Sequence, residues 1–270
     1  ALSVATPALA QNVYGHIART HALTAADDFK LGQGLVRNYA WMHGTLQSPE
    51  QQTRVEGLMR RVIGASDRPD LVFDVTLVDD ESVNAAAFPG GFMIVTRGAL
   101  EGMTDDQLAF VMAHEISHVL LRHNNSRSNL DEAMHGLDAV TQARSDEDRE
   151  RAQQAYDEVR KMVAGYQRKH EFEADLYGLL YAVRAGIDPQ AGIQTMEGLR
   201  TTVGEIPSWY ADYASHPTFA DRIAELKKGM TTIEETAARF DAGVSMLESG
   251  REDQAAAAFQ EYLTLFPHSS

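Results

Sequence analysis

The residues of this chain best suited to chemistry stand in one short motif, His114-Glu115-Ile116-Ser117-His118. On a helix this spacing puts both histidines on one face, about 6 Å apart along the axis. Two imidazoles so placed can bind one Zn²⁺ at about 2.0–2.1 Å. Glu115 lies beside the ion, where it can take a proton from a zinc-bound water. The motif therefore predicts a metallohydrolase, most often a peptidase, with two ligands and a general base.

The residues around the motif favour a metal site over a solvent-exposed helix that carries two histidines by chance. Apolar side chains such as Leu108, Met112 and Val119 surround it, so most of this helix should be buried. Histidine and glutamate are costly to bury without partners, and a metal ion would supply one. Residues 104–107, Thr-Asp-Asp-Gln, form a capping-box pattern that indicates the start of the helix.

A catalytic zinc ion usually takes three protein ligands and leaves a fourth position for water. The best source of the third ligand is segment 169–178, Lys-His-Glu-Phe-Glu-Ala-Asp-Leu-Tyr-Gly. On a helix Glu171 and Asp175 share a face, whereas Glu173 points almost oppositely. One carboxylate could bind zinc while the other orients a ligand histidine, or the segment could be an acidic patch that faces solvent. The other downstream candidates are His123, His135, His170, Glu173 and His216.

Together these segments resemble the zinc metallopeptidase family that includes HtpX and the CAAX prenyl proteases, which carries HExxH and a downstream ExxxD. Residues 84–98 also resemble the family's N-A-x-x-x-P-G-G segment, and residues 215–223 its S/T-H-P…R-I segment. The resemblance implies a mostly helical, zincin-type (gluzincin) α+β domain with one Zn²⁺ per chain. The residues that it assigns are His114, His118 and Glu171 as metal ligands, Glu115 as the base and Asp175 as the acid behind a ligand.

Residues 89–96 indicate how a substrate could bind. Pro89-Gly90-Gly91 predicts a turn, and residues 92–96, Phe-Met-Ile-Val-Thr, predict the strand that follows. The segment is at least an ordinary hairpin. An exposed edge strand beside the zinc helix would also bind an extended peptide through main-chain hydrogen bonds, with little sequence preference.

His216 precedes Pro217, which disfavours helix at the histidine, so we expect a turn there. The turn either lies at the surface before the next helix or returns to the cleft. In the cleft, His216 would stabilise the developing oxyanion during catalysis or occupy the fourth zinc position at rest. Tyr210 and Tyr213 are rival hydrogen-bond donors, and Arg222 could tie the loop to an acidic residue near the site.

The composition limits the class of protein and its partners. With 270 residues, 44% of them hydrophobic, the chain can bury a full core and hold one catalytic domain plus an appendage. The net charge of −15 makes nucleic acid and anionic membrane surfaces poor partners. No apolar run is long enough to predict a transmembrane helix. The absence of cysteine excludes disulfides and thiolate metal sites.

The start of the sequence indicates an export signal. Ala8-Leu9-Ala10 ends a small, apolar segment and fits the A-x-A pattern that signal peptidase cleaves. We therefore predict that residues 1–10 are a signal-peptide remnant and that the protein is exported, to a bacterial periplasm. An alanine-rich helix start is the alternative.

Hydrophobic periodicity predicts an α+β architecture, with a small antiparallel sheet packed against a mostly helical body. A strand is expected over residues 71–79, and one or two more within residues 83–96. Residues 124–150 are polar and should form a solvated helix or loop beside the cleft. Helices are expected within residues 11–66 and over residues 105–122, 152–185, 189–203 and 218–229.

Residues 11–230 are predicted to form the metallopeptidase domain, and residues 231–270 a helical hairpin like one tetratricopeptide repeat. The small, aromatic and proline positions of that repeat match Gly243, Ala255, Phe259 and Pro267. A plain helical hairpin is the alternative. A single repeat buries its own face poorly, so it should dock on the catalytic body or precede further repeats. Exported BepA-like members of the family join these two modules.

The predicted function is zinc-dependent endoproteolysis of protein or peptide substrates, in envelope protein quality control. The repeat could bind a protein partner. The alternative is a chaperone or adaptor that acts through the repeat and whose protease site is latent or plugged. Complete HEISH and EFEAD motifs favour the enzyme, since a degenerate site would tolerate losses there.

Overall fold

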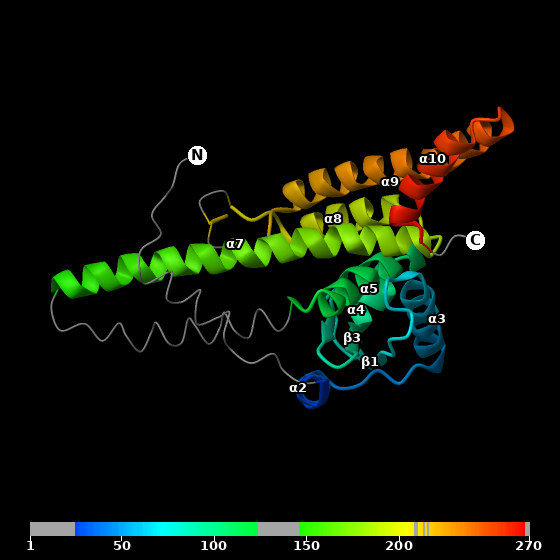
Figure 1. Ribbon diagram of the computed structural model, residues 1–270. Helices are drawn as coiled ribbons and strands as arrows, with labels where there is room; N and C mark the ends of the chain where they lie inside the picture. The colour runs from blue at the N-terminus through cyan, green and yellow to red at the C-terminus, as the bar shows by residue number, and fades with distance from the viewer. Residues whose placement is uncertain (1–24, 124–145, 208–209, 213, 215, 268–270) are drawn as a thin grey trace.

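The computed structural model describes residues 25–123, 146–207, 210–212, 214 and 216–267. They form a mostly helical molecule with a small three-stranded sheet, in line with the predicted α+β class (Figure 1). The predicted signal remnant, residues 1–10, and residues 124–145 of the polar segment lie outside the described residues. Within the described part, no helix is both long enough and apolar enough to cross a lipid bilayer.

Apart from a short helix at residues 97–102, which was not predicted, the helices and strands follow the order that the sequence predicts. The strands are β1 (Asp74–Val78), β2 (Ala85–Phe88) and β3 (Phe92–Thr96). The helices are α2 (Ala25–His43), α3 (Pro49–Ala65), α4 (Arg97–Gly102), α5 (Asp105–Leu120), α7 (Asp146–Arg184), α8 (Gln190–Val203), α9 (Phe219–Glu248) and α10 (Glu252–Leu265). The main difference in length is α9, which continues well past its predicted end at residue 229.

The sheet is mixed, with the order β1-β3-β2. β2 and β3 form an antiparallel hairpin, whose turn places Gly90 and Gly91 at φ angles of 79° and 83°, a region that favours glycine. β1 pairs with β3 in parallel. The prediction of an antiparallel sheet is therefore wrong for this pair, because the chain crosses from β1 to β2 before it returns as β3.

β3 is the central strand, and all five of its residues are buried. Phe92 and Ile94 pack under Val36 of α2, whereas Met93 and Val95 face the main core on the other side of the sheet. An uninterrupted apolar run is typical of a strand covered on both faces. The edge strand beside α5 is therefore β2, and not the strand predicted over residues 92–96.

Helix α5 lies at the centre of the body. It packs against α3, α7, α8 and β2, and its apolar side chains belong to the main hydrophobic core. In Figure 1, α7 crosses the molecule, with α9 on one side and α3, α5 and the sheet on the other. The motif residues of α5 are thus enclosed by other elements, which is the setting that a buried polar site needs.

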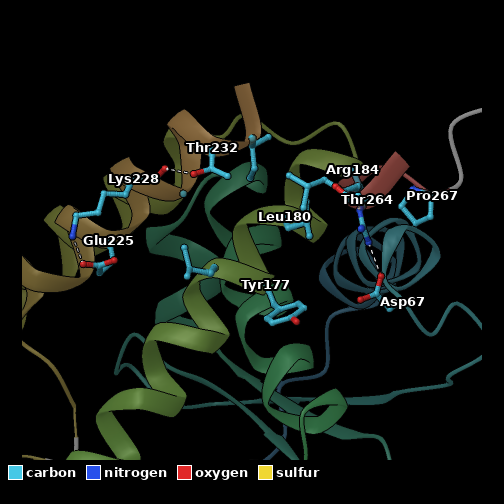
Figure 2. A pocket seen from close by; sticks show the side chains of 13 residues that line it. Asp67, Tyr177, Leu180, Arg184, Glu225, Lys228, Thr232, Thr264 and Pro267 are labelled. Atoms are coloured by element: carbon cyan, nitrogen blue, oxygen red, sulfur yellow. Dashed lines mark hydrogen bonds and ion pairs between the residues drawn. The ribbon is translucent and has the colours of Figure 1, made fainter. Parts of the chain in front are cut away.

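α9 carries the chain from this body into a helical hairpin. The helix is continuous through residue 230, so the predicted catalytic and C-terminal parts share it. α10 packs on α9 at Gly243, where an added Cβ would lie 2.6 Å from the ring of Phe259. At the far end of α10, Arg184 of α7 donates a hydrogen bond to the Leu265 carbonyl. Next to this contact, α7, α9 and α10 line an open pocket of about 540 Å³ (Figure 2).

Candidate metal centre

Helix α5 positions the HEISH motif. The Thr104 hydroxyl accepts a hydrogen bond from the Gln107 N–H, and the Gln107 side chain accepts one from the Thr104 N–H, so the predicted capping box is present. Leu108, Met112 and Ile116 are buried in the main core. Burial of these side chains fixes the rotation of the helix about its axis and turns the motif toward α7 and β2.

α7 approaches α5 closely enough to bring its carboxylates to the motif. At Gly178, an added Cβ would lie 2.9 Å from the Cα of His114, so a larger residue would force the helices apart. Glu171 and Asp175 lie about two turns and one turn earlier on α7, and both face α5. Glu173 lies on a different side of α7, as its spacing predicts, and its Oε2 lies 3.2 Å from Nε2 of His123.

Three side chains converge on one point. The Nε2 atoms of His114 and His118 lie 3.1 Å apart. Oxygens of Glu171 lie 3.8 Å from Nε2 of His114 and 3.5 Å from Nε2 of His118. Ligand atoms around a tetrahedral zinc ion with bonds of about 2.05 Å are about 3.3 Å apart. The donor set and its spacing therefore suit one metal ion.

Asp175 lies behind this group and contacts the ring of His114. Its Oδ1 lies 2.9 Å from Nδ1 of His114, on the side of the ring away from the metal position. Arg222 of α9 donates to both Asp175 oxygens, at 2.7 and 2.6 Å, and its Nη1 lies 3.5 Å from Oε2 of Glu171. Burial alone would raise the pKa of Asp175, but the Arg222 guanidinium and His114 outweigh it and lower that pKa. Arg222 thus joins the first turn of α9, just after the loop, to both acidic residues of α7.

Glu115 is held by the edge strand. Its Oε2 accepts a hydrogen bond of 2.9 Å from the Ala87 N–H, and its Oε1 lies 4.0 Å from Nε2 of His114. Because the Thr96 N–H donates to the Asn84 carbonyl, alternate residues of β2 pair with β3 and Ala87 points its N–H away from the sheet. Burial raises the pKa of Glu115, and His114 and the Ala87 N–H oppose this only in part. Such a carboxylate is suited to accept a proton.

The ionisation of the other two groups favours metal binding. Burial alone would raise the pKa of Glu171, but a hydrogen bond from His216 and the nearby positive charges bring that pKa well below its usual value. Burial lowers the pKa of His118 to about 3, and the charge of His114 acts in the same direction. Anionic carboxylate and neutral imidazole are the forms that bind a metal ion.

His216 reaches the site from the segment between α8 and α9. Its Nδ1 lies 3.1 Å from Oε2 of Glu171, and its side chain is 57% exposed. Arg168 of α7 holds this segment by donating to three carbonyls of residues 211–214, at 3.0 to 3.1 Å. The turn at His216 therefore returns to the cleft, which is one of the two arrangements that the sequence allowed.

The remaining candidates lie elsewhere or have other contacts. Tyr210 is absent from the lining of the site cavity, and His135 and Tyr213 fall outside the described residues. His123 contacts His118 directly, with their Nδ1 atoms 2.9 Å apart. His123 is a candidate ligand in the sequence, but its contact with His118 was not predictable, because no helical spacing relates a residue after the end of α5 to one within it. A histidine directly after a buried helix was the available signal.

A cavity of about 200 Å³ adjoins the site. Its polar lining includes His114, Glu115, Glu171, His216 and Arg222. Its apolar lining includes Val83, Ala99, Met103, Phe110, Met196 and Leu199. There is thus space for part of a substrate beside the Glu115 carboxylate.

The comparison with protein families agrees with this geometry. Residues 49–230, more than half of the chain, match the model of peptidase family M48. The chain belongs to peptidase family M48. The matched span contains every residue of the candidate site, from the edge strand to Arg222 of α9. Members of this family are metal-dependent, which accords with the converging donor set.

Curated relatives of this M48 chain are named as proteases. It is 26% identical over 202 residues, 73% of its length, to the mitochondrial metalloendopeptidase OMA1 of Schizosaccharomyces pombe. It is 28% identical over 179 residues, 63% of its length, to the beta-barrel assembly-enhancing protease of Escherichia coli. It is 29% identical over 168 residues, 57% of its length, to human OMA1. The chain spans 59%, 37% and 32% of the length of these relatives, respectively.

Proposed function

We propose that this chain is a zinc-dependent endopeptidase. The observation that carries the proposal is the convergence of His114, His118 and Glu171 next to a Glu115 carboxylate anchored on an edge strand. Membership of peptidase family M48 and relatives named as metalloendopeptidases support it. His114, His118 and Glu171 would hold the zinc, which supplies a Lewis acid for the scissile carbonyl and lowers the pKa of a bound water.

Glu115 would act as the general base. Its raised pKa favours uptake of a proton from the attacking water, and it would then deliver that proton to the leaving amine. The Ala87 N–H holds the carboxylate in place at 2.9 Å. Asp175 and Arg222 would orient His114 and Glu171.

The edge of β2 that faces away from β3 is the proposed binding surface for the substrate main chain. Ala85 directs its main-chain groups away from β3, toward the side where Glu115 lies, whereas the Ala87 N–H on the same side already donates to Glu115. An extended peptide added there would gain main-chain hydrogen bonds and would cross the site beside the base. Recognition through the main chain suits an enzyme that cleaves many different proteins.

His216 is proposed to take part from the open side of the cleft. Its position next to Glu171 is compatible with donation to the developing oxyanion. It is equally compatible with occupation of the fourth zinc position at rest. Because the side chain is more than half exposed, it can move between these positions without repacking the core.

The cellular role is proposed from the relatives and the hairpin. The name of the Escherichia coli relative concerns assembly of beta-barrels, which supports export to a bacterial periplasm and a role in envelope protein quality control. In the α9–α10 hairpin an added Cβ at Gly243 would meet the ring of Phe259, and Ala255 is buried. Small and aromatic residues at these positions support a likeness to a tetratricopeptide repeat. We propose that it is a single repeat-like unit that contacts a protein partner.

The test compares the wild type with Glu115→Gln in degradation of casein, with zinc content measured for both. Glutamine keeps the size of the side chain and its contact with the Ala87 N–H but cannot take a proton. The expected result is full zinc content in both proteins and loss of cleavage only in the variant. Cleavage at the wild-type rate by Glu115→Gln would contradict the proposed base.

A further inference from the structure

The second ring nitrogen of His118 has a partner of its own. Nε2 of His118 faces Nε2 of His114, and its Nδ1 lies 2.9 Å from Nδ1 of His123. The His118 ring meets the His114 ring edge to face at an interplanar angle of 77°, and the His123 ring at 74°. His123 in turn directs Nε2 toward Oε2 of Glu173, at 3.2 Å. α7 thus stands behind both histidines of the motif, with Asp175 contacting His114 directly and Glu173 reaching His118 through His123.

One arrangement of protons satisfies every nitrogen in this chain of contacts. A neutral imidazole donates from one nitrogen and accepts at the other. If Nε2 of His118 keeps its lone pair for a metal ion, Nδ1 carries the proton and donates to Nδ1 of His123. His123 then carries its proton on Nε2, which faces the Glu173 carboxylate. His118 is thereby held in the tautomer that metal binding requires.

The backbone bends sharply to bring His123 to this place. α5 ends at Leu120, and Arg122 has a φ angle of 58°, a left-handed conformation that strains a residue with a Cβ. Among the described residues no other non-glycine residue has a positive φ. The bend turns His123 back beneath the end of α5, where it is buried. Strain of this kind persists where surrounding contacts impose it, often at functional sites.

A second metal site is the rival explanation, since His123, His170 and Glu173 could also hold an ion. The ring of His170 lies flat on that of His123, with centroids 4.0 Å apart and an interplanar angle of 5°. A metal ion lies near the plane of each imidazole that binds it, at about 2.0–2.1 Å from nitrogen. Two parallel rings stacked at this distance cannot share one ion. His170 therefore covers His123 and does not act as its partner ligand.

We propose that His123 is a positioning residue for His118, which it orients as a metal ligand on behalf of Glu173. The inference rests on the proposed function, because it assumes that His118 binds the catalytic zinc. Groups that orient a metal ligand typically change metal affinity about 10- to 100-fold when they are lost. His123 touches neither substrate nor metal, so its effect should appear first in metal binding.

The test measures zinc affinity by competition with a chelator, and the visible spectrum of the cobalt-substituted protein, for three variants. His123→Phe keeps the ring but removes both nitrogens, and should weaken zinc binding about 10- to 100-fold and alter the cobalt spectrum. His123→Asn places an oxygen near the position of Nδ1, and should restore most of the affinity. His170→Phe keeps the stacked ring without its nitrogens, and should leave affinity and spectrum as in the wild type.

Circular dichroism and thermal melting of each variant show whether it folds. If His123→Phe does not fold, Glu173→Ala takes its place, because the Glu173 side chain is 38% exposed and its loss should weaken zinc binding without unfolding the protein. Wild-type zinc affinity in the folded His123→Phe protein would overturn the positioning role of His123 but not the proposed function. A second zinc ion that both His123→Phe and His170→Phe lose would overturn it in favour of a metal site. A wild type that binds no zinc would overturn the proposed function itself.

Discussion

The two histidines of the motif are supported from behind in different ways. Behind His114, Asp175 is completely buried and paired through both oxygens with Arg222. Behind His118, the support runs through His123 to Glu173, which is 38% exposed and whose cation partner Lys169 is 69% exposed. A buried ion pair becomes costly as soon as one partner is lost, whereas an exposed pair contributes little. The Asp175–Arg222 pair behind His114 should therefore matter to both folding and metal binding. The contacts of His123 and Glu173 behind His118 should matter mainly to metal binding.

The largest difference between the two supports is expected when the cation of the buried pair is removed. Arg222→Leu leaves the Asp175 carboxylate buried without its partner, and should lower the free energy of unfolding by about 3–5 kcal/mol. Urea denaturation of the zinc-free protein measures this. The matched control is Lys169→Gln at the exposed pair, which should change the free energy of unfolding by less than about 0.5 kcal/mol. Equal losses in the free energy of unfolding in Arg222→Leu and Lys169→Gln would contradict the distinction between the buried and the exposed ion pair.

A second prediction concerns the carboxylates themselves. Asp175→Asn removes the charge that faces Nδ1 of His114, and should weaken zinc binding about 10- to 100-fold. Glu173→Gln keeps an acceptor for His123, and should change zinc affinity by no more than about threefold. Chelator competition on the two folded variants measures the zinc affinity of each relative to the wild type. A larger loss of zinc affinity in Glu173→Gln than in Asp175→Asn would contradict the prediction that the buried carboxylate matters more.

The smallest expected effect is at the bend before His123. Arg122→Gly removes the strain of a left-handed residue, and should raise the free energy of unfolding by about 0.5–1 kcal/mol after the added flexibility of glycine is counted. Zinc affinity should stay as in the wild type, because the bend itself is preserved. Urea denaturation and chelator competition measure the two effects. Destabilisation of the protein would show that the Arg122 side chain, and not its backbone, matters at this position.

The local parts of the site were predictable from the sequence. The four-residue spacing of His114 and His118 puts both on one helix face. The same spacing puts Glu171 and Asp175 on one face of their helix and Glu173 on another. Both predictions agree with the geometry of α5 and α7. The contact between His123 and His118 was not predictable, because it depends on the backbone conformation of Arg122 and on the distance between two helices.

The larger errors have long-range causes. The parallel pairing of β1 with β3 depends on which strand enters the middle of the sheet, and no local pattern encodes that. The early end predicted for α9 has a different cause. Gly229, at the predicted end of the helix, lies within α9, where an added Cβ would be 2.7 Å from Leu176 of α7. Glycine there allows two helices to pack closely, and the helix continues through it.

His114, His118 and Glu171 are proposed to hold the catalytic zinc, and this assignment can be tested by locating the ion. A crystal structure of the zinc-loaded protein, with anomalous scattering recorded at the zinc edge, locates the ion independently of the protein model. We expect one strong peak, at about 2.0–2.2 Å from Nε2 of both histidines and from an oxygen of Glu171. A peak held by His123, His170 and Glu173, or a Glu171 side chain turned away from the ion, would contradict it.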